Sequence, residues 1–250
     1  MSARRLCLAL AVTGALLISA AVVHANGLNL SWDACGAAGV ANKQFACNIN
    51  YWSEYLVLSA EFPMEWIGSL PISFDATLDL TSAQATLPNW WRLGSGECRA
   101  GAIASGFESD GRVGSCTASA DAAGSITTLA WTSSGISPER RRLTISSRPD
   151  VGYDGIYASG EMLMDVLQIS HVKTTGIGAC SGCTTPVCIV LNSVTVYDYP
   201  PLGGGIRAYV TNPLQRNFVT WQGGTSGMAI CPAATPARTP TWGALKAMYR

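Results

Sequence analysis

The stretch Cys188-Ile-Val-Leu-Asn-Ser-Val-Thr-Val-Tyr-Asp-Tyr199 decides the fold class, because it is the most strand-like segment of the chain. Its apolar residues are bulky or β-branched, which is typical of strands: Ile189, Leu191, Val194 and Val196. Pro200 and Pro201 end the segment because proline cannot donate a hydrogen bond to a strand ladder. We therefore predict a strand over 188–199.

Eight further segments carry strand patterns. Within 72–80, apolar residues alternate with polar ones, which predicts a half-buried strand. We predict the other strands at 28–32, 55–62, 126–131, 143–146, 161–170, 206–211 and 218–222. Such a series without helical crossovers predicts an all-β fold, an antiparallel two-sheet sandwich of immunoglobulin- or cohesin-like architecture. A short helix is expected only near the C-terminus, at 241–250.

The first 25 residues have the parts of a secretory signal peptide. Arg4 and Arg5 form a positive start, an apolar run covers 6–23, and Ala25 supplies a small residue for cleavage. An uncleaved membrane anchor is the alternative, because the apolar run approaches spanning length. We predict a signal peptide at 1–25, one domain at 26–240 and a helix or tail at 241–250. The expected location is outside the cytoplasm: secreted, periplasmic or at the cell surface.

Charge limits the class of partner. The whole chain has 16 basic and 16 acidic residues, so cleavage after Ala25 leaves 14 basic ones and a net charge near −2. No basic stripe is present, which argues against nucleic acid as a partner. No second apolar run reaches spanning length, so no membrane span is expected after cleavage. The expected partners are a carbohydrate or a cell-surface protein.

The same cleavage leaves eight cysteines, an even number typical of an exported domain held by disulfides. Short spacing favours two local pairs, Cys35 with Cys47 and Cys98 with Cys116. The other four allow three connectivities, of which we favour Cys183 with Cys188 and Cys180 with Cys231. A tetrahedral zinc site made by these last four cysteines is the alternative. Because an oxidising compartment favours disulfides, we expect neither a metal nor a cofactor.

Candidate catalytic residues are few. After cleavage His171 is the one remaining histidine, and we expect it to bond backbone groups at a strand end. A hydrolase would then depend on two carboxylates across a cleft. Four acids on predicted strands are candidates for that role: Asp75, Asp79, Glu161 and Asp165. Outward, solubilising positions are the simpler expectation for them.

Tryptophans are the best candidates for ligand contact. An exposed planar ring matches the apolar face of a sugar, and this role is predicted for Trp52, Trp90 and Trp91. Packing in the core or anchoring of a loop is the simpler expectation for the same rings.

The motifs of the first half are Gly27-Leu-Asn-Leu-Ser-Trp32 with Cys35, Phe45-Ala-Cys47-Asn48, and Leu87-Pro-Asn-Trp-Trp91 with Cys98-Arg99. Those of the second half are Cys180-Ser-Gly-Cys183, Pro186-Val-Cys188, Phe218-Val-Thr-Trp-Gln-Gly223, Cys231-Pro232, and Thr241-Trp-Gly243 before Tyr249-Arg250. Together they resemble a group of secreted bacterial β-sandwich proteins with paired cysteines. The resemblance covers nearly the whole mature chain. It implies a secreted sandwich and no particular chemistry, since no activity is assigned to that group.

These observations favour a secreted, disulfide-bonded module with a binding or structural role and no catalytic activity. A secreted, glycosidase-like hydrolase that depends on carboxylates is the alternative, and a structural surface component that assembles by itself is a third interpretation. Convergence of two carboxylates in a groove is the feature that would favour the hydrolase.

Overall fold

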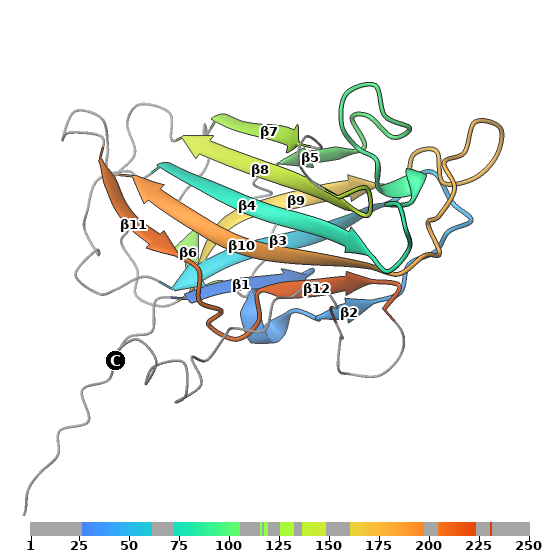
Figure 1. Ribbon diagram of the computed structural model, residues 1–250. Coiled ribbons are helices and arrows are strands. Elements are labelled where there is room, and N and C mark those ends of the chain that lie inside the picture. The colour runs from blue at the N-terminus through green and yellow to red at the C-terminus, as the bar shows by residue number, and fades with distance from the viewer. Residues whose placement is uncertain are drawn as a thin grey trace, which may run out of the picture.

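The computed structural model describes residues 27–61, 73–105, 116, 118–119, 126–132, 137–148, 161–197, 205–223 and 231. In these residues the chain forms two β-sheets and almost no helix (Figure 1). The predicted signal peptide at 1–25 and the predicted helix at 241–250 lie outside the described residues. Within the described ranges, no helix has the length and apolar character needed to cross a membrane.

The first sheet has five strands in the order β1-β3-β9-β5, with β6 also paired to β9. All its pairs are antiparallel except β6 with β9. The strands are β1 (Gly27–Trp32), β3 (Ser53–Glu61), β9 (Glu161–Ser170), β5 (Ile103–Ser105) and β6 (Ala118–Ser119).

The second sheet has seven strands in the order β2-β12-β10-β4-β8-β7, with β11 also paired to β10. Only β12 with β2 is parallel. Its strands are β2 (Asn42–Lys43), β12 (Phe218–Trp221), β10 (Val187–Tyr197), β4 (Ser73–Ser82), β8 (Arg140–Arg148), β7 (Ile126–Thr132) and β11 (Ile206–Val210). Every predicted strand is thus confirmed as an element. The short strands β2, β5 and β6 were not predicted.

Side chains from both sheets share one hydrophobic core. The alternation predicted for 72–80 is confirmed, because the apolar side chains of β4 are at most 4% exposed: Phe74, Ala76, Leu78 and Leu80. In Figure 1, β4, β8 and β10 lie in front of β3 and β9. The two sheets therefore pack against each other through this core.

An extra residue in β10 explains why the core-facing positions of this strand change from odd to even residue numbers. The core residues Ile189 and Leu191 have odd numbers, whereas Val194 and Val196 have even ones. The pairing of β10 with β4 shifts by one residue between these two pairs. A bulge lets both pairs point into the same core, although strict alternation would turn one pair outward.

All eight cysteines pair, as predicted, but none of the four predicted pairs forms. The bridges join residues whose Cα atoms are 5.3–6.0 Å apart: Cys35–Cys116, Cys47–Cys183, Cys98–Cys180 and Cys188–Cys231. They connect positions 43 to 136 residues apart in the chain, so spacing in the sequence could not reveal them. Several disulfides fit a protein of an oxidising, extracytoplasmic compartment.

Candidate binding site

Three loop regions meet at one end of the sheets: 44–52, 83–102 and 171–186. The bridge Cys47–Cys183 joins the first to the third, and Cys98–Cys180 joins the second to the third. These loops lie together at the right-hand end of Figure 1. We call these three regions the clamped end.

The structure corrects the prediction of ligand contact for Trp90 and Trp91. Both belong to the short 3-10 helix η3 (Asn89–Trp91), and both side chains are fully buried. The Trp90 ring centroid lies 4.5 Å from that of Trp221, and its Nε1 donates to the Thr174 hydroxyl over 2.9 Å. Neither ring is accessible to a sugar or a protein at the surface. They anchor the loop to the core, which was the simpler expectation.

A buried arginine connects two of the loops. Arg99 is 1% exposed, and its guanidinium donates to the backbone carbonyls of Trp90, Val172 and Ser170. The guanidinium carbon also lies 3.5 Å from the centroid of the Trp90 ring, which adds a cation–π contact. Burial lowers the pKa of Arg99 to about 9, so the side chain stays charged at neutral pH. Arg99 therefore satisfies three carbonyls that water does not reach easily.

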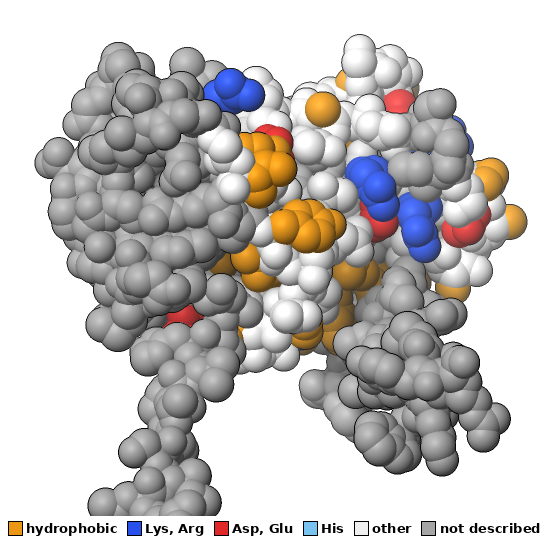
Figure 2. Space-filling view, turned by 60° about the vertical axis from the view of Figure 1, so that its left-hand side comes forward, with side chains coloured by type: hydrophobic (Ala, Val, Ile, Leu, Met, Phe, Trp, Pro, Cys, Tyr) orange, Lys and Arg blue, Asp and Glu red, His pale blue; other side chains and the backbone are white. Residues whose placement is uncertain are grey.

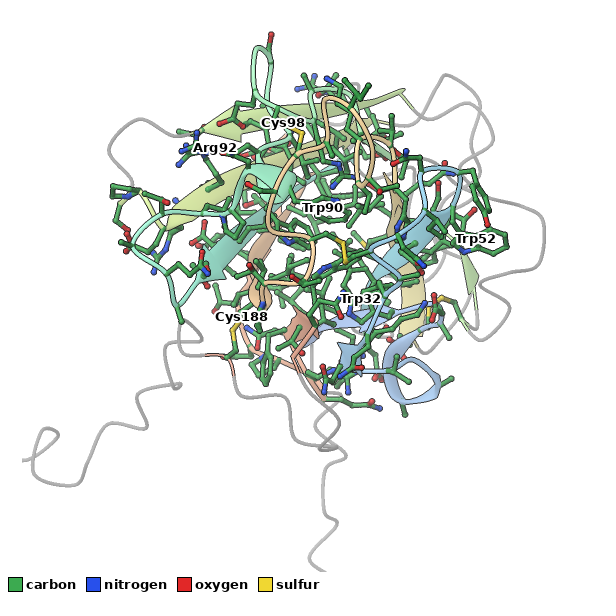
Figure 3. All side chains as sticks on the ribbon, turned by 90° about the vertical axis from the view of Figure 1, so that its right-hand side faces the viewer. Trp32, Trp52, Trp90, Arg92, Cys98 and Cys188 are labelled. Carbon is green, nitrogen blue, oxygen red and sulfur yellow. A yellow bond between two sulfur atoms is a disulfide. The ribbon has the colours of Figure 1, made fainter. Side chains whose placement is uncertain are left out.

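Two loops of the clamped end, 44–52 and 171–186, carry four exposed apolar side chains, which we call the apolar patch. Its members are Tyr51 at 81% exposed, Trp52 at 57%, Val172 at 43% and Ile177 fully exposed. In Figure 3, Trp52 points away from the molecule at its periphery, while Trp90 and Trp32 lie inside. Exposed apolar side chains that gather in one place mark interaction sites more often than isolated ones do. Trp52 remains the one predicted contact residue that a partner can reach.

Backbone and amide hydrogen bonds fix the patch. The Asn50 amide oxygen accepts from the backbone N–H groups of Thr174 (2.8 Å) and Thr175 (3.0 Å). Its amide nitrogen donates to the Thr175 carbonyl over 3.0 Å, and the His171 N–H donates to the Trp52 carbonyl over 2.7 Å. The loop carrying Trp52 is therefore tied to 171–175 on both sides of the ring.

A chain of charged and polar groups connects the buried His171 to the surface. His171 Nε2 is 2.9 Å from Glu54 Oε1, and Glu54 Oε2 is 3.1 Å from Lys43 Nζ. Lys43 Nζ also lies 2.6 Å from Asp33, which is half exposed. The expectation that the His171 ring bonds backbone groups is wrong, because the ring pairs with a carboxylate. This chain reaches from the surface to the core and joins β3 to the loops.

Two candidate catalytic acids lie on β4 and have structural partners. Asp79 accepts two hydrogen bonds from Arg142, at 2.8 and 2.9 Å. Asp75 accepts from the Tyr197 hydroxyl over 2.8 Å, and this hydrogen bond is the main reason that the pKa of Tyr197 is raised. Both carboxylates are therefore engaged within the second sheet.

The other two candidate acids lie on β9. Glu161 accepts from the side chains of Asn29 and Ser59. Asp165 is fully buried, and both its oxygens lie within hydrogen-bond distance of the Ser105 hydroxyl, at 2.7 and 2.8 Å. Burial raises the pKa of Asp165 to about 7, although the hydrogen bonds from Ser105 and the Val166 N–H favour the charged form. Asp165 is thus the most strongly perturbed acid among the described residues.

Neither pair of acids on the same strand has the spacing of a catalytic pair. Asp75 and Asp79, like Glu161 and Asp165, are four residues apart on one strand, which corresponds to roughly 13 Å. A glycosidase pair is separated by about 5 to 10 Å. A groove of about 340 Å³ lies between the ends of β4, β8, β10 and β12, and Glu139 is the one carboxylate that lines it.

The cysteines considered as zinc ligands do not converge either. They belong to three different disulfides, with the partners Cys98 for Cys180, Cys47 for Cys183, and Cys188 with Cys231. The described residues contain no group of three or more histidine, cysteine or acidic side chains that could hold a metal ion.

Sequence reasoning missed most residues that build this end. Arg99 and Asn50 look like ordinary surface residues in the sequence. Apart from the Trp90 carbonyl, the groups that they bond lie 71 to 125 residues away. Ile177 carried a usable signal, because it is an apolar residue between two turn glycines, Gly176 and Gly178. Comparison of the chain with protein-family models and with curated proteins finds no match.

Proposed function

We propose that the protein is a secreted, non-catalytic module that binds another protein through the apolar patch of the clamped end. The observation that carries this proposal is the exposure of Tyr51 and Trp52 on a loop that Asn50 and a disulfide hold in place. Tryptophan and tyrosine are the residues that most often dominate binding energy at protein interfaces.

Rigidity supports the same interpretation. A partner that binds a mobile loop must order it, at about 0.5–1.5 kcal/mol for each side chain that becomes fixed. Here the backbone beside Trp52 is already bonded to His171, and the loop is bridged through Cys47. The backbone that carries the ring is thus fixed before any partner binds.

Figure 2 brings forward the side of the molecule away from the clamped end. In the view of Figure 2, hydrophobic side chains form separate groups, and basic and acidic side chains lie next to each other. Asp79 on β4 and Arg142 on β8 form an ion pair of opposite charges within the second sheet. The apolar patch combines four apolar side chains on two neighbouring loops, an arrangement suited to a protein surface.

A glycan is the second candidate partner, supported by the exposed face of the Trp52 ring. The alternative of a carboxylate-dependent hydrolase receives less support, because each candidate acid has a structural partner on its own sheet. The two packed sheets are compatible with a sandwich of immunoglobulin- or cohesin-like architecture, which we propose as the fold family. Secretion through a signal peptide at 1–25 belongs to the same proposal.

The test compares the purified protein with the single variants Trp52→Ala and Tyr51→Ala. Binding is measured against surface-exposed proteins of the producing cell by quantitative cross-linking, and against soluble polysaccharides by calorimetry. We expect each variant to weaken binding to its protein partner by roughly tenfold or more, as for an interface hot spot.

Tyr209→Ala is the matched control. Tyr209 is 67% exposed on β11, outside the clamped end, so this variant removes an equally exposed ring elsewhere. Equal binding by Trp52→Ala, Tyr209→Ala and the unchanged protein would refute the proposed site. Loss of polysaccharide binding alone in Trp52→Ala would replace the protein partner with a glycan.

A further inference from the structure

The strand β7 (Ile126–Thr132) lies at one edge of the seven-stranded sheet. Within the part of the chain that the structure describes, it pairs only with β8. An edge strand leaves every second backbone N–H and C=O without a partner in the ladder, and these groups can pair with another strand.

The sequence of β7 does not protect this edge. Ile-Thr-Thr-Leu-Ala-Trp-Thr contains no charged residue and no proline, the two devices that most often block pairing at an edge. The charged residues lie on the neighbouring strand β8 and not at the edge itself. They are Arg140, Arg141, Arg142 and Arg148.

The opposite situation holds at the edge strand β1 of the five-stranded sheet. There the segment 212–216 supplies backbone partners within the same chain. Leu28 N–H donates to the Asn212 carbonyl over 2.9 Å, and Leu30 N–H donates to the Arg216 carbonyl over 2.8 Å. The fold therefore closes the edge of β1 by itself, while β7 has no such segment among the described residues.

β7 is also held in a conformation ready for pairing. Leu129 and Trp131 pack against the core, whereas Thr128, Ala130 and Thr132 are exposed on the other face. The strand is thus anchored along its inner face, and an added strand would find its backbone already extended.

We propose that the β7 edges of two copies of this chain pair antiparallel, so that the protein forms a two-fold symmetric dimer through a continuous sheet. A second copy fits because antiparallel pairing of identical strands is self-complementary. Centred on Leu129, the pairing sets Thr128 of each copy opposite Ala130 of the other and keeps both inner faces on the core side. No like charges meet across the seam, because β7 contains no charged residue.

The experiment measures sedimentation of the intact protein across roughly three decades of concentration, because mass action favours the dimer as concentration rises. We expect the mass to double, and the outward amides of β7 to exchange their hydrogens more slowly at high concentration. The double variant Thr128→Lys with Ala130→Lys places lysines directly opposite each other across the seam. We expect it to raise the dissociation constant of the dimer by about tenfold or more.

The matched control is Thr144→Lys with Ser146→Lys on β8, the cross-strand partners of Ala130 and Thr128. It adds the same charge on the same face, one strand away from the edge, and should dimerise like the unchanged protein. A protein that stays monomeric at the highest concentration would overturn the proposal, and so would equal dissociation of both double variants. Trp52→Ala should dimerise normally, so failure here is distinguishable from failure of the proposed binding site.

Discussion

Replacing Asp165 by asparagine should stabilise the protein at neutral and alkaline pH and change little at acidic pH. Asp165 is fully buried on β9, and burial raises its pKa from 3.8 to about 7. The hydrogen bonds from the Ser105 hydroxyl and the Val166 N–H favour the carboxylate but do not offset the loss of water.

The sign of the effect follows from proton linkage. The folded protein binds the Asp165 proton more tightly than the unfolded chain does, where the pKa is near 3.8. The carboxyl therefore does not destabilise the fold below that pH, lowers the free energy of unfolding progressively up to about pH 7, and adds a constant penalty above it. At about 1.4 kcal/mol for each pH unit, the full penalty is about 4 kcal/mol. Asparagine does not titrate, so the variant should escape this penalty.

The assay is urea unfolding with the disulfides intact, followed by tryptophan fluorescence between about pH 4 and about pH 8. The gain in free energy of unfolding from Asp165→Asn should grow by about 4 kcal/mol across that range. Ser105→Ala gives a second measurement, because loss of its hydrogen bond should raise the pKa of Asp165 further and destabilise the protein more at high pH. A stability difference between Asp165→Asn and the unchanged protein that does not depend on pH would refute the reasoning.

Three further predictions concern the buried polar contacts and the disulfides. Arg99→Ala should destabilise the protein by roughly 3 kcal/mol or more in urea unfolding, because three buried carbonyls lose their donor, and Arg99→Lys should recover only part of it. Glu54→Gln should lower the free energy of unfolding by roughly 1–3 kcal/mol, because it weakens the contact with His171. A double-mutant cycle with His171→Gln should show a coupling energy above about 0.5 kcal/mol, and additive effects would contradict the contact between Glu54 and His171. Peptide mapping without reduction should recover the bridges Cys35–Cys116, Cys47–Cys183, Cys98–Cys180 and Cys188–Cys231, and any peptide that links Cys35 to Cys47 would contradict the fold at this end.

The strands could be predicted from the sequence because their signal is local. In β4, four apolar residues at every second position face one core, so the pattern and its cause lie within ten residues. Even the change of phase in β10 is visible in the sequence, although only pairing with β4 shows that a bulge absorbs it. The short strands β2, β5 and β6 have two or three residues each, too few for any pattern to appear.

The disulfides and the buried tryptophans could not be predicted in the same way, because their causes are not local. Cys47 lies next to Cys183 because β3 pairs with β9, which brings the loop before β3 close to the loop after β9. Trp90 and Trp91 follow a proline in a loop, and nothing near them in the sequence identifies Trp221 of β12 as the apolar surface for both rings. Position in the sequence therefore could not distinguish Trp52, which is exposed, from Trp90, which is not.

The construction of the clamped end is itself an argument for a binding role. The shared core of the two sheets already stabilises the fold, yet this end adds two disulfides and the buried charge of Arg99, which must be desolvated. Loops that only connect strands do not need such support, and they are usually the more mobile part of a domain. Fixing them is useful where a ring must be presented in a single conformation to another molecule. The loop that Cys47–Cys183 and Asn50 hold in place also contains the exposed side chains of Tyr51 and Trp52. Rigidity and exposed apolar area therefore occur at the same place.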